Sequence, residues 1–266
     1  MSTATLPLPT TGIARDFRIF LTETHYEFVR MARTRTFSLS VIGFPVMFYV
    51  LFGLLLNRGE HFAGGAGAAR YLLAGYSIFG AVGAALFGVG VGLAAELSAG
   101  WLELKRASPM PPLAYLLAKC CTAMAFGVII VCLLCALGLA FGHVSLSLAD
   151  FARMIGLTLA AAVPFACMGL VLALLVPMNS APGVTNMIYL PMSFLGGLWL
   201  PVDALPHFLR AFAPALPTFH AGQLMLGVLG FPTRGSASSH WFYLIGFTLI
   251  MLGIASLLFR RRDQNA

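Results

Sequence analysis

The residues whose types and spacing could support catalysis or metal binding are few in this chain. Cys132-x-x-Cys135 has a redox or metal-binding spacing, but it lies in an apolar segment without a second ligand pair. We therefore interpret it, with Cys120, Cys121 and Cys167, as buried apolar side chains that form no disulfide. No G-x-x-x-x-G-K-[ST], H-E-x-x-H or G-x-S-x-G motif occurs. We expect the chain to hold no metal or cofactor and to hydrolyse no ATP itself.

The carboxylates do not suggest an ion-driven pump. Coupling to protons or sodium usually requires an ionisable group within the membrane. All nine acidic residues are expected in loops or at the ends of apolar segments: Asp16, Glu23, Glu27, Glu60, Glu96, Glu103, Asp150, Asp203 and Asp263. If the chain transports something, the energy is expected to come from another protein.

The elements that carry these residues are apolar enough to lie in a membrane. Hydrophobic residues make up 59% of the chain and charged residues 9%, which is outside the range of soluble domains. We predict one all-α integral membrane domain over residues 1–266, with about six transmembrane helices. The predicted spans are 36–56, 70–95, 113–142, 151–176, 183–200 and 240–259.

The distribution of basic residues predicts the orientation. Eleven of them flank the predicted spans on one side, which the positive-inside rule makes cytoplasmic: Arg15, Arg18, Arg30, Arg33, Arg35, Lys105, Arg106, Lys119, Arg260, Arg261 and Arg262. Six spans place both termini on that side. The net charge of +7 therefore reflects the orientation of the chain in the membrane and not a nucleic-acid partner. The expected membrane is the plasma (inner) membrane of a bacterium.

Two segments are predicted to be helical without crossing the membrane. Residues 15–34 repeat apolar side chains every three or four positions, which is typical of an amphipathic helix lying on the inner leaflet. Residues 201–231 are apolar but divided by prolines into pieces too short to span. We predict a pair of re-entrant helices there, dipping into the outer leaflet before the last span.

The loop at 96–112 is a candidate docking element. It places Glu96, Glu103, Lys105, Arg106 and three prolines between two long spans, on the predicted cytoplasmic side. A short, charged and rigid loop of this kind can dock in a groove of a partner. A loop that merely obeys the positive-inside rule would have a similar composition.

Three features together resemble the membrane subunits of ATP-binding-cassette type-2 exporters. The amphipathic helix at 15–34 resembles the connecting helix of that family. The run from Glu96 through Gly100-Trp-Leu-Glu-Leu and Pro109 to Lys119 resembles its coupling helix. The run 191–201 (PMSFLGGLWLP), followed by Leu-Pro pairs, resembles its fifth span and re-entrant helices; the residues of this match are Gly196, Gly197, Pro201, Pro206 and Pro217.

The resemblance implies a permease that binds two separate ATPase subunits, which carry the ATP and Mg. It also implies a second permease, either another copy or a sister chain, and contact with membrane lipids. The implied ATPase-coupling residues are Glu96, Gly100, Trp101, Glu103, Lys105, Arg106 and Pro109. The implied substrate route lies between the first, second and fifth spans, with Met47, Phe48, Phe52, Asn186, Tyr189 and Met192 as candidates.

The implied function is export of a hydrophobic or amphipathic compound, a lipid or a lipid-linked glycan, from the cytoplasm or the inner leaflet. Two other functions stay open on the sequence: a membrane-embedded enzyme acting on lipid, and a structural membrane subunit without a transport path. The substrate, and the choice between homodimer and heterodimer, do not follow from the residues.

Overall fold

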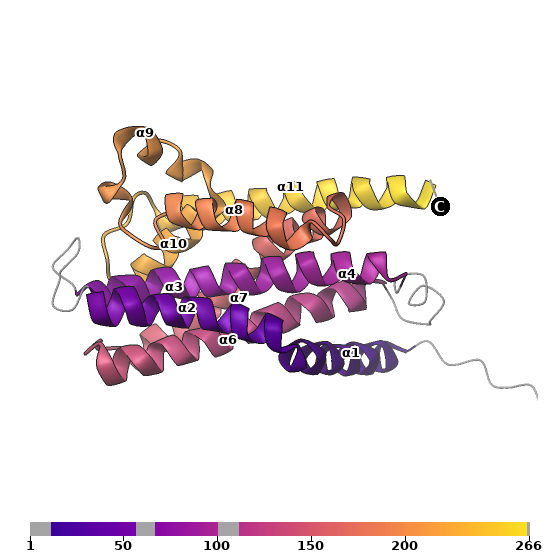
Figure 1. Ribbon diagram of the computed structural model, residues 1–266, viewed down its shortest axis with the longest axis horizontal. Helices are drawn as coiled ribbons and strands as arrows, with labels where there is room; N and C mark the ends of the chain where they lie inside the picture. The colour runs from indigo at the N-terminus through magenta and orange to yellow at the C-terminus, as the bar shows by residue number, and fades with distance from the viewer. Residues whose placement is uncertain (1–11, 57–66, 101–111, 265–266) are drawn as a thin grey trace, which may run out of the picture.

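The computed structural model describes residues 12–56, 67–100 and 112–264, which form helices and connecting turns with no strand. The long helices run side by side along the long axis of the molecule (Figure 1). In chain order the elements are α1 Ile13–Arg33, α2 Arg35–Phe48, η1 Tyr49–Leu56, α3 Ala68–Ala85, η2 Leu86–Val91, α4 Gly92–Ser98, α6 Pro112–Phe141, α7 Leu148–Leu175, α8 Ala181–Leu195, η3 Val202–Ala204, α9 His207–Arg210, η4 Ala213–Ala215, α10 Pro217–Val228 and α11 Ala237–Gln264.

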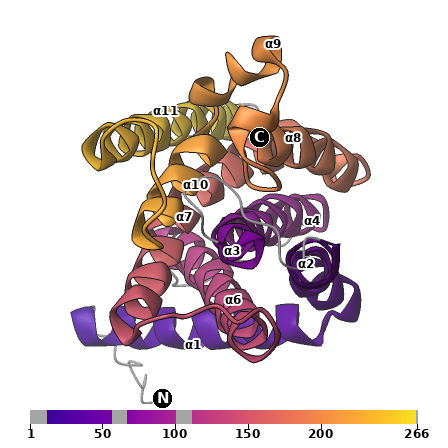
Figure 2. The same ribbon diagram turned by 90° about the vertical axis from the view of Figure 1, so that its left-hand side faces the viewer.

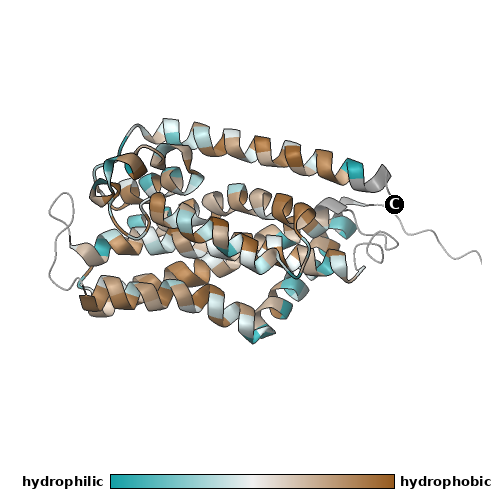
Figure 3. Ribbon diagram, turned by 45° about the horizontal axis from the view of Figure 1, so that its top comes forward, coloured by the Kyte–Doolittle hydropathy of each residue, from teal (hydrophilic) through white to brown (hydrophobic). Residues whose placement is uncertain are grey.

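Five helical stretches in the described residues are long and apolar enough to cross a membrane. They are Arg35–Leu56, Ala68–Ser98, Ala114–Phe141, Leu148–Leu175 and Ala237–Arg261. The first joins α2 to the π-helical η1, and the second joins α3, the π-helical η2 and α4. Figure 3 shows hydrophobic residues along these stretches and hydrophilic ones mainly near the two ends of the bundle. The chain is an all-α integral membrane protein, as predicted.

The fifth predicted span is shorter than the sequence indicated. Residues 183–200 were predicted to cross, but α8 has 15 residues and ends at Leu195, which gives about 22 Å of helix. The helix ends because Gly197 adopts φ +80°, while the Leu198 amide donates to the Ser193 carbonyl at 3.1 Å. This bond pattern closes a helix and needs a left-handed residue, which glycine supplies without strain.

Helix α3 lies at the centre of the bundle, between α2, α6, α7 and α10 (Figure 2). In the most apolar 18-residue part of the stretch Ala68–Ser98, 78% is buried inside the protein. The corresponding part of the stretch that contains α11 is 11% buried. Glycines let the neighbours of α3 approach closely: a Cβ at Gly75 would lie 1.9 Å from the Leu198 carbonyl oxygen. The second span is therefore packed against protein, whereas α11 presents most of its surface outward.

The segment 201–231 forms four short elements, η3, α9, η4 and α10. The longest, α10, has 12 residues, so none is long enough to span, as predicted. Pro206 precedes α9, and Pro217 begins α10, where its missing N–H is not needed. Helix α10 packs against α3, α7 and α11. Entry of these elements into the outer leaflet stays a prediction.

Helix α1 lies crosswise to the bundle. It runs across Figure 2, in which most of the long helices are viewed nearly end-on, and it packs mainly on α6. The end of α11 lies at the same end of the bundle as α1 (Figure 1). We call this the α1 end, and the end that carries α9 the α9 end.

Three cysteines differ from the expectation that all five are buried. Cys132 is exposed on α6, Cys120 and Cys121 are half-buried, and Cys135 and Cys167 are buried; all five are free. Residues three apart on a helix need not share one environment, because α6 is packed on one side and open on the other.

Candidate functional site

A cluster of charged side chains lies buried at the α1 end, where three helices meet. Lys119 of α6 places its Nζ 2.6 Å from Oε1 of Glu27 on α1 and 2.9 Å from Oε1 of Glu96 on α4. Arg30 of α1 pairs with Glu27 at 2.8 Å and also with Glu96. The Tyr115 hydroxyl donates to the second oxygen of Glu96. We call these five residues the α1–α4–α6 cluster.

The α1–α4–α6 cluster is balanced in charge, with two carboxylates facing two cations. The Lys119 side chain is 0% exposed and the two glutamates are 5% exposed. Burial by itself would raise the pKa of Glu27, but the attraction and hydrogen bonds of Lys119 and Arg30 outweigh it, so that the pKa of Glu27 lies below its ordinary value of 4.5. Glu27 is therefore held as a carboxylate beside Lys119 and Arg30.

The position of the α1–α4–α6 cluster links the helices on either side of residues 101–111. Helix α4 ends at Ser98, just before that segment, and α6 begins at Pro112, just after it. Lys119, on the helix that follows this segment, bonds Glu96 on the helix that precedes it, and also Glu27 on α1. Gly100 has φ +71°, a left-handed conformation that glycine adopts without strain.

Aromatic side chains gather where α2, α3 and α8 meet. The rings of Phe79 and Tyr189 stack at 4.6 Å, and the Tyr189 hydroxyl donates to the Phe79 carbonyl at 2.8 Å. Phe48 lies 5.2 Å from the ring of Trp199, which in turn lies 5.6 Å from Phe79. We call this group the aromatic cluster. It connects the first, second and fifth predicted spans.

The ABC-2 type transporter family matches the chain over residues 19–230, which includes α1, the α1–α4–α6 cluster and the aromatic cluster. The chain belongs to this family. A protein of Bacillus subtilis (strain 168) named "Putative transport permease YvfS" is 26% identical over 241 residues, which cover 90% of this chain and 96% of that protein. Membership of the ABC-2 type transporters makes the chain a transporter subunit of the membrane, and it implies an ATP-binding-cassette ATPase as partner.

The residues predicted to couple an ABC-2 permease to its ATPase are described only in part. Trp101, Glu103, Lys105, Arg106 and Pro109 lie outside the described residues. Glu96 is described, and its carboxylate is buried and bound by Lys119, Arg30 and Tyr115. In this structure Glu96 thus holds the end of α4 to α1 and α6, and its contact with an ATPase stays a prediction.

Sequence reasoning missed Glu27 and the structural role of Lys119. Lys119 was grouped with the basic residues that flank the loop, but it lies two turns inside α6 and within a predicted span. A cation inside an apolar segment needs a buried partner. That signal points to a nearby carboxylate, although it cannot choose between those of α1 and α4.

The predicted substrate-route residues of the permease separate into three environments. Met47 and Asn186 are exposed, Phe48 and Phe52 are half-buried, and Tyr189 and Met192 are buried. Phe48 and Tyr189 join the aromatic cluster, whereas Asn186 faces outward on α8. Of the re-entrant signature, Gly196 lies against Thr218, the residue after Pro217, and Gly197 lies against Val202, the residue after Pro201.

The pKa of Glu27 predicts how the docking of α1 depends on pH. Because the folded pKa lies below 4.5, the pairing stabilises docking fully above that pH and is lost as the pH falls through the folded value. Spin labels at Leu21 on α1 and Leu117 on α6 should keep one narrow distance from neutral pH to 4.5 and broaden only below it. A Glu27→Gln variant should be broadened already at neutral pH. Broadening of the unmodified chain between pH 7 and 5 would exclude this role of Glu27.

Proposed function

We propose that this chain is the membrane subunit of an ATP-driven exporter, which moves a hydrophobic or amphipathic compound, a lipid or a lipid-linked glycan from the cytoplasm or inner leaflet. ATP and Mg would bind two separate ATPase subunits. A second copy of the chain or a sister permease would complete the complex. Family membership supports the transport role, and the buried α1–α4–α6 cluster is the observation that carries the mechanism.

The α1–α4–α6 cluster gives a route for force from the ATPase into the membrane. A push on residues 101–111 would be transmitted to α4 and α6, the helices that enter and leave the loop. Salt bridges in a buried setting hold these helices together with α1, so the three would move as a unit. A partner shifts a conformational equilibrium only if its own contacts differ between the two states, and ATPase closure on the loop would supply that difference.

The second span can carry this movement to the aromatic cluster. Helices α4, η2 and α3 are continuous from Ser98 to Ala68. The π-helical η2 interrupts the regular bonding at Leu86–Val91, and such segments are frequent at functional sites. Phe87 of η2 contacts the ring of Tyr189 at 5.9 Å. Rotation of the second span would therefore change the contacts of α8.

The charge distribution supports the proposed orientation. Helix α1 carries Arg30 and Arg33, and the far end of α11 carries Arg260 and Arg261, all near the α1 end. The positive-inside rule assigns that end to the cytoplasm, where ATPase subunits are found. Both termini would then be cytoplasmic, in the plasma membrane of a bacterium.

The coupling assignment is tested by exchanging charges in the loop. Glu103→Arg together with Lys105→Glu should abolish co-purification of the ATPase and export, because the contact would be mismatched in charge, while membrane insertion stays normal. Ser236→Arg with Ser238→Glu, which introduces the same charges at the exposed α9 end, should leave both readouts unchanged. Normal ATPase co-purification and export in the loop variant would rule out the assignment.

A further inference from the structure

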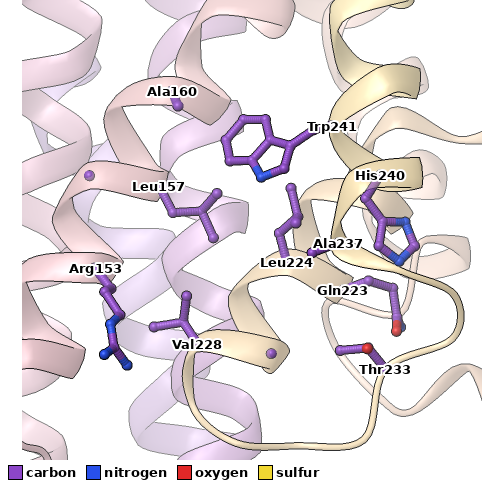
Figure 4. A pocket seen from close by; sticks show the side chains of 12 residues that line it. Arg153, Leu157, Ala160, Gln223, Leu224, Val228, Thr233, Ala237, His240 and Trp241 are labelled. Carbon is purple, nitrogen blue, oxygen red and sulfur yellow. The ribbon is translucent and has the colours of Figure 1, made fainter.

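A cavity of about 630 Å³ opens between α7, α10 and α11, near the α9 end (Figure 4). Leu157, Leu224, Val228 and Trp241 provide much of its apolar lining. Trp241 is 36% exposed and belongs to α11, the helix that presents most of its surface outward. The cavity therefore faces the side of the bundle on which membrane lipid lies.

Small side chains on α7 create this space. Gly156 and Ala160 line the cavity one turn apart, and a Cβ added at Gly156 would meet no atom of the described residues within 4 Å. The hollow is open toward the outside of the bundle and is not an enclosed void. In a membrane it would therefore be filled from the lipid side, and the occupant at hand there is an acyl chain.

Polarity changes along the cavity in the same order as along a lipid. Arg153, Leu157 and Ala160 share one face of α7, at spacings of four and three residues. Arg153 is nearest the start of the helix at the α9 end, and Ala160 lies about 10 Å deeper. A guanidinium at the rim with apolar residues below it matches a phosphate with an acyl chain beneath it.

The α9 end is also complementary to an anion in its charge. Among the described residues at that end, four arginines face two aspartates: Arg70, Arg153, Arg210 and Arg234 against Asp150 and Asp203. The Arg153 side chain is 65% exposed, and its pairing with Asp150 is long, at 3.5 Å. The other carboxylate oxygen of Asp150 accepts a hydrogen bond from the Ser147 amide in a capping box. Arg153 can thus turn to a phosphate.

A polar wall completes the site. Gln223, Thr233 and His240 line the cavity on the side away from α7. The Gln223 Oε1 accepts from the Arg234 amide at 2.7 Å, which fixes the Gln223 side chain in this wall. A headgroup with hydroxyl groups, such as a phosphoglycerol, could reach this wall from the rim.

We propose that this cavity binds one anionic phospholipid from the surrounding membrane, with its phosphate at Arg153 and an acyl chain between Leu157 and Trp241. The lipid is a bound component of the permease and not its cargo. The site therefore does not depend on the proposed coupling to an ATPase, and it can be tested without one.

The experiment uses Trp241 as the reporter. With Trp101→Phe and Trp199→Phe, Trp241 is the remaining tryptophan of the chain. The protein is placed in phosphatidylcholine vesicles that contain a minor fraction of lipid with brominated chains, either phosphatidylglycerol or phosphatidylcholine. Bromine quenches a nearby indole. Brominated phosphatidylglycerol should associate about fivefold more strongly than brominated phosphatidylcholine, the effect of one arginine at a membrane surface.

Two variants separate the headgroup contact from the cavity. Arg153→Ala should abolish the preference for phosphatidylglycerol, and Arg153→Lys should largely keep it. Gly156→Leu should fill the cavity and reduce quenching by both lipids to a level without preference. Gly253→Leu is the matched control, because Gly253 also has no atom within 4 Å of its Cβ position but lies on the exposed face of α11; it should behave as the parent protein.

Each variant is compared with the parent protein after size-exclusion chromatography has shown that it elutes as a folded species. Equal quenching by the two lipids in the parent protein would overturn the proposal. A preference that survives Arg153→Ala would exclude the phosphate contact. A preference that survives Gly156→Leu would exclude the cavity and leave surface attraction alone as the cause.

Discussion

Replacing Lys119 by methionine is expected to lower the free energy of unfolding by about 3–5 kcal/mol and to release α1 from the bundle. Lys119 is fully buried and has Glu27 and Glu96 within 3 Å of its Nζ, at 2.6 and 2.9 Å. Without it, Arg30 is the one cation left in the α1–α4–α6 cluster to face two buried carboxylates. Reversible unfolding in mixed micelles measures the loss, and the labels at Leu21 and Leu117 report the position of α1.

The matched variants for this prediction alter the charge balance in steps. Lys119→Arg keeps the charge and should cost less. Lys119→Met combined with Glu27→Gln removes one charge of each sign, so that Arg30 and Glu96 remain as a pair. The double variant should therefore be more stable than Lys119→Met alone, a non-additivity typical of residues in contact. If the single and double variants lose equal stability, the carboxylates do not depend on Lys119.

Replacing Gly75 by alanine is expected to destabilise the protein by about 3 kcal/mol, at the upper end for an overpacked core. The added Cβ would lie 1.9 Å from the carbonyl oxygen of Leu198. That atom belongs to the backbone of the turn that ends α8, so it cannot move aside as a flexible side chain would. The contact of α3 with this turn should open, and the thermal midpoint of the purified protein should fall.

Gly43→Ala is the control for this change. Gly43 lies in α2, and no atom lies within 4 Å of its Cβ position. Alanine is the better helix former by up to about 1 kcal/mol, so this variant should be neutral or slightly stabilised. An unchanged thermal midpoint for Gly75→Ala would show that α3 and the turn after α8 are not in close contact.

The spans could be predicted from the sequence because each is encoded locally. A run of about 20 apolar residues is sufficient to define a membrane helix, and the starts of all five long helical stretches lie within three residues of expectation. The end of α8 was misplaced because it depends on packing at Gly196 and Gly197. Both glycines lie in an apolar run that hydropathy alone reads as continuous.

The α1–α4–α6 cluster could not be predicted because its partners are distant in sequence. Glu27 and Lys119 are 92 residues apart, and Glu96 and Lys119 are 23 apart. Only the crosswise packing of α1 on α6 brings them together. The resemblance in motif singled out Glu96, but it could not show that its carboxylate pairs with Lys119.

Photo-crosslinking at the two ends of the bundle tests the central claim most directly, which is that an ATPase drives this permease from the α1 end. A photoreactive amino acid at Ala99, exposed at the end of α4, and one at Ser238, exposed at the start of α11, would be irradiated in intact cells. The products would be identified by mass spectrometry. We predict that Ala99 crosslinks to a protein with an ATP-binding phosphate loop and that Ser238 does not. Capture of that ATPase from Ser238, or its absence from Ala99, would contradict the proposed mechanism.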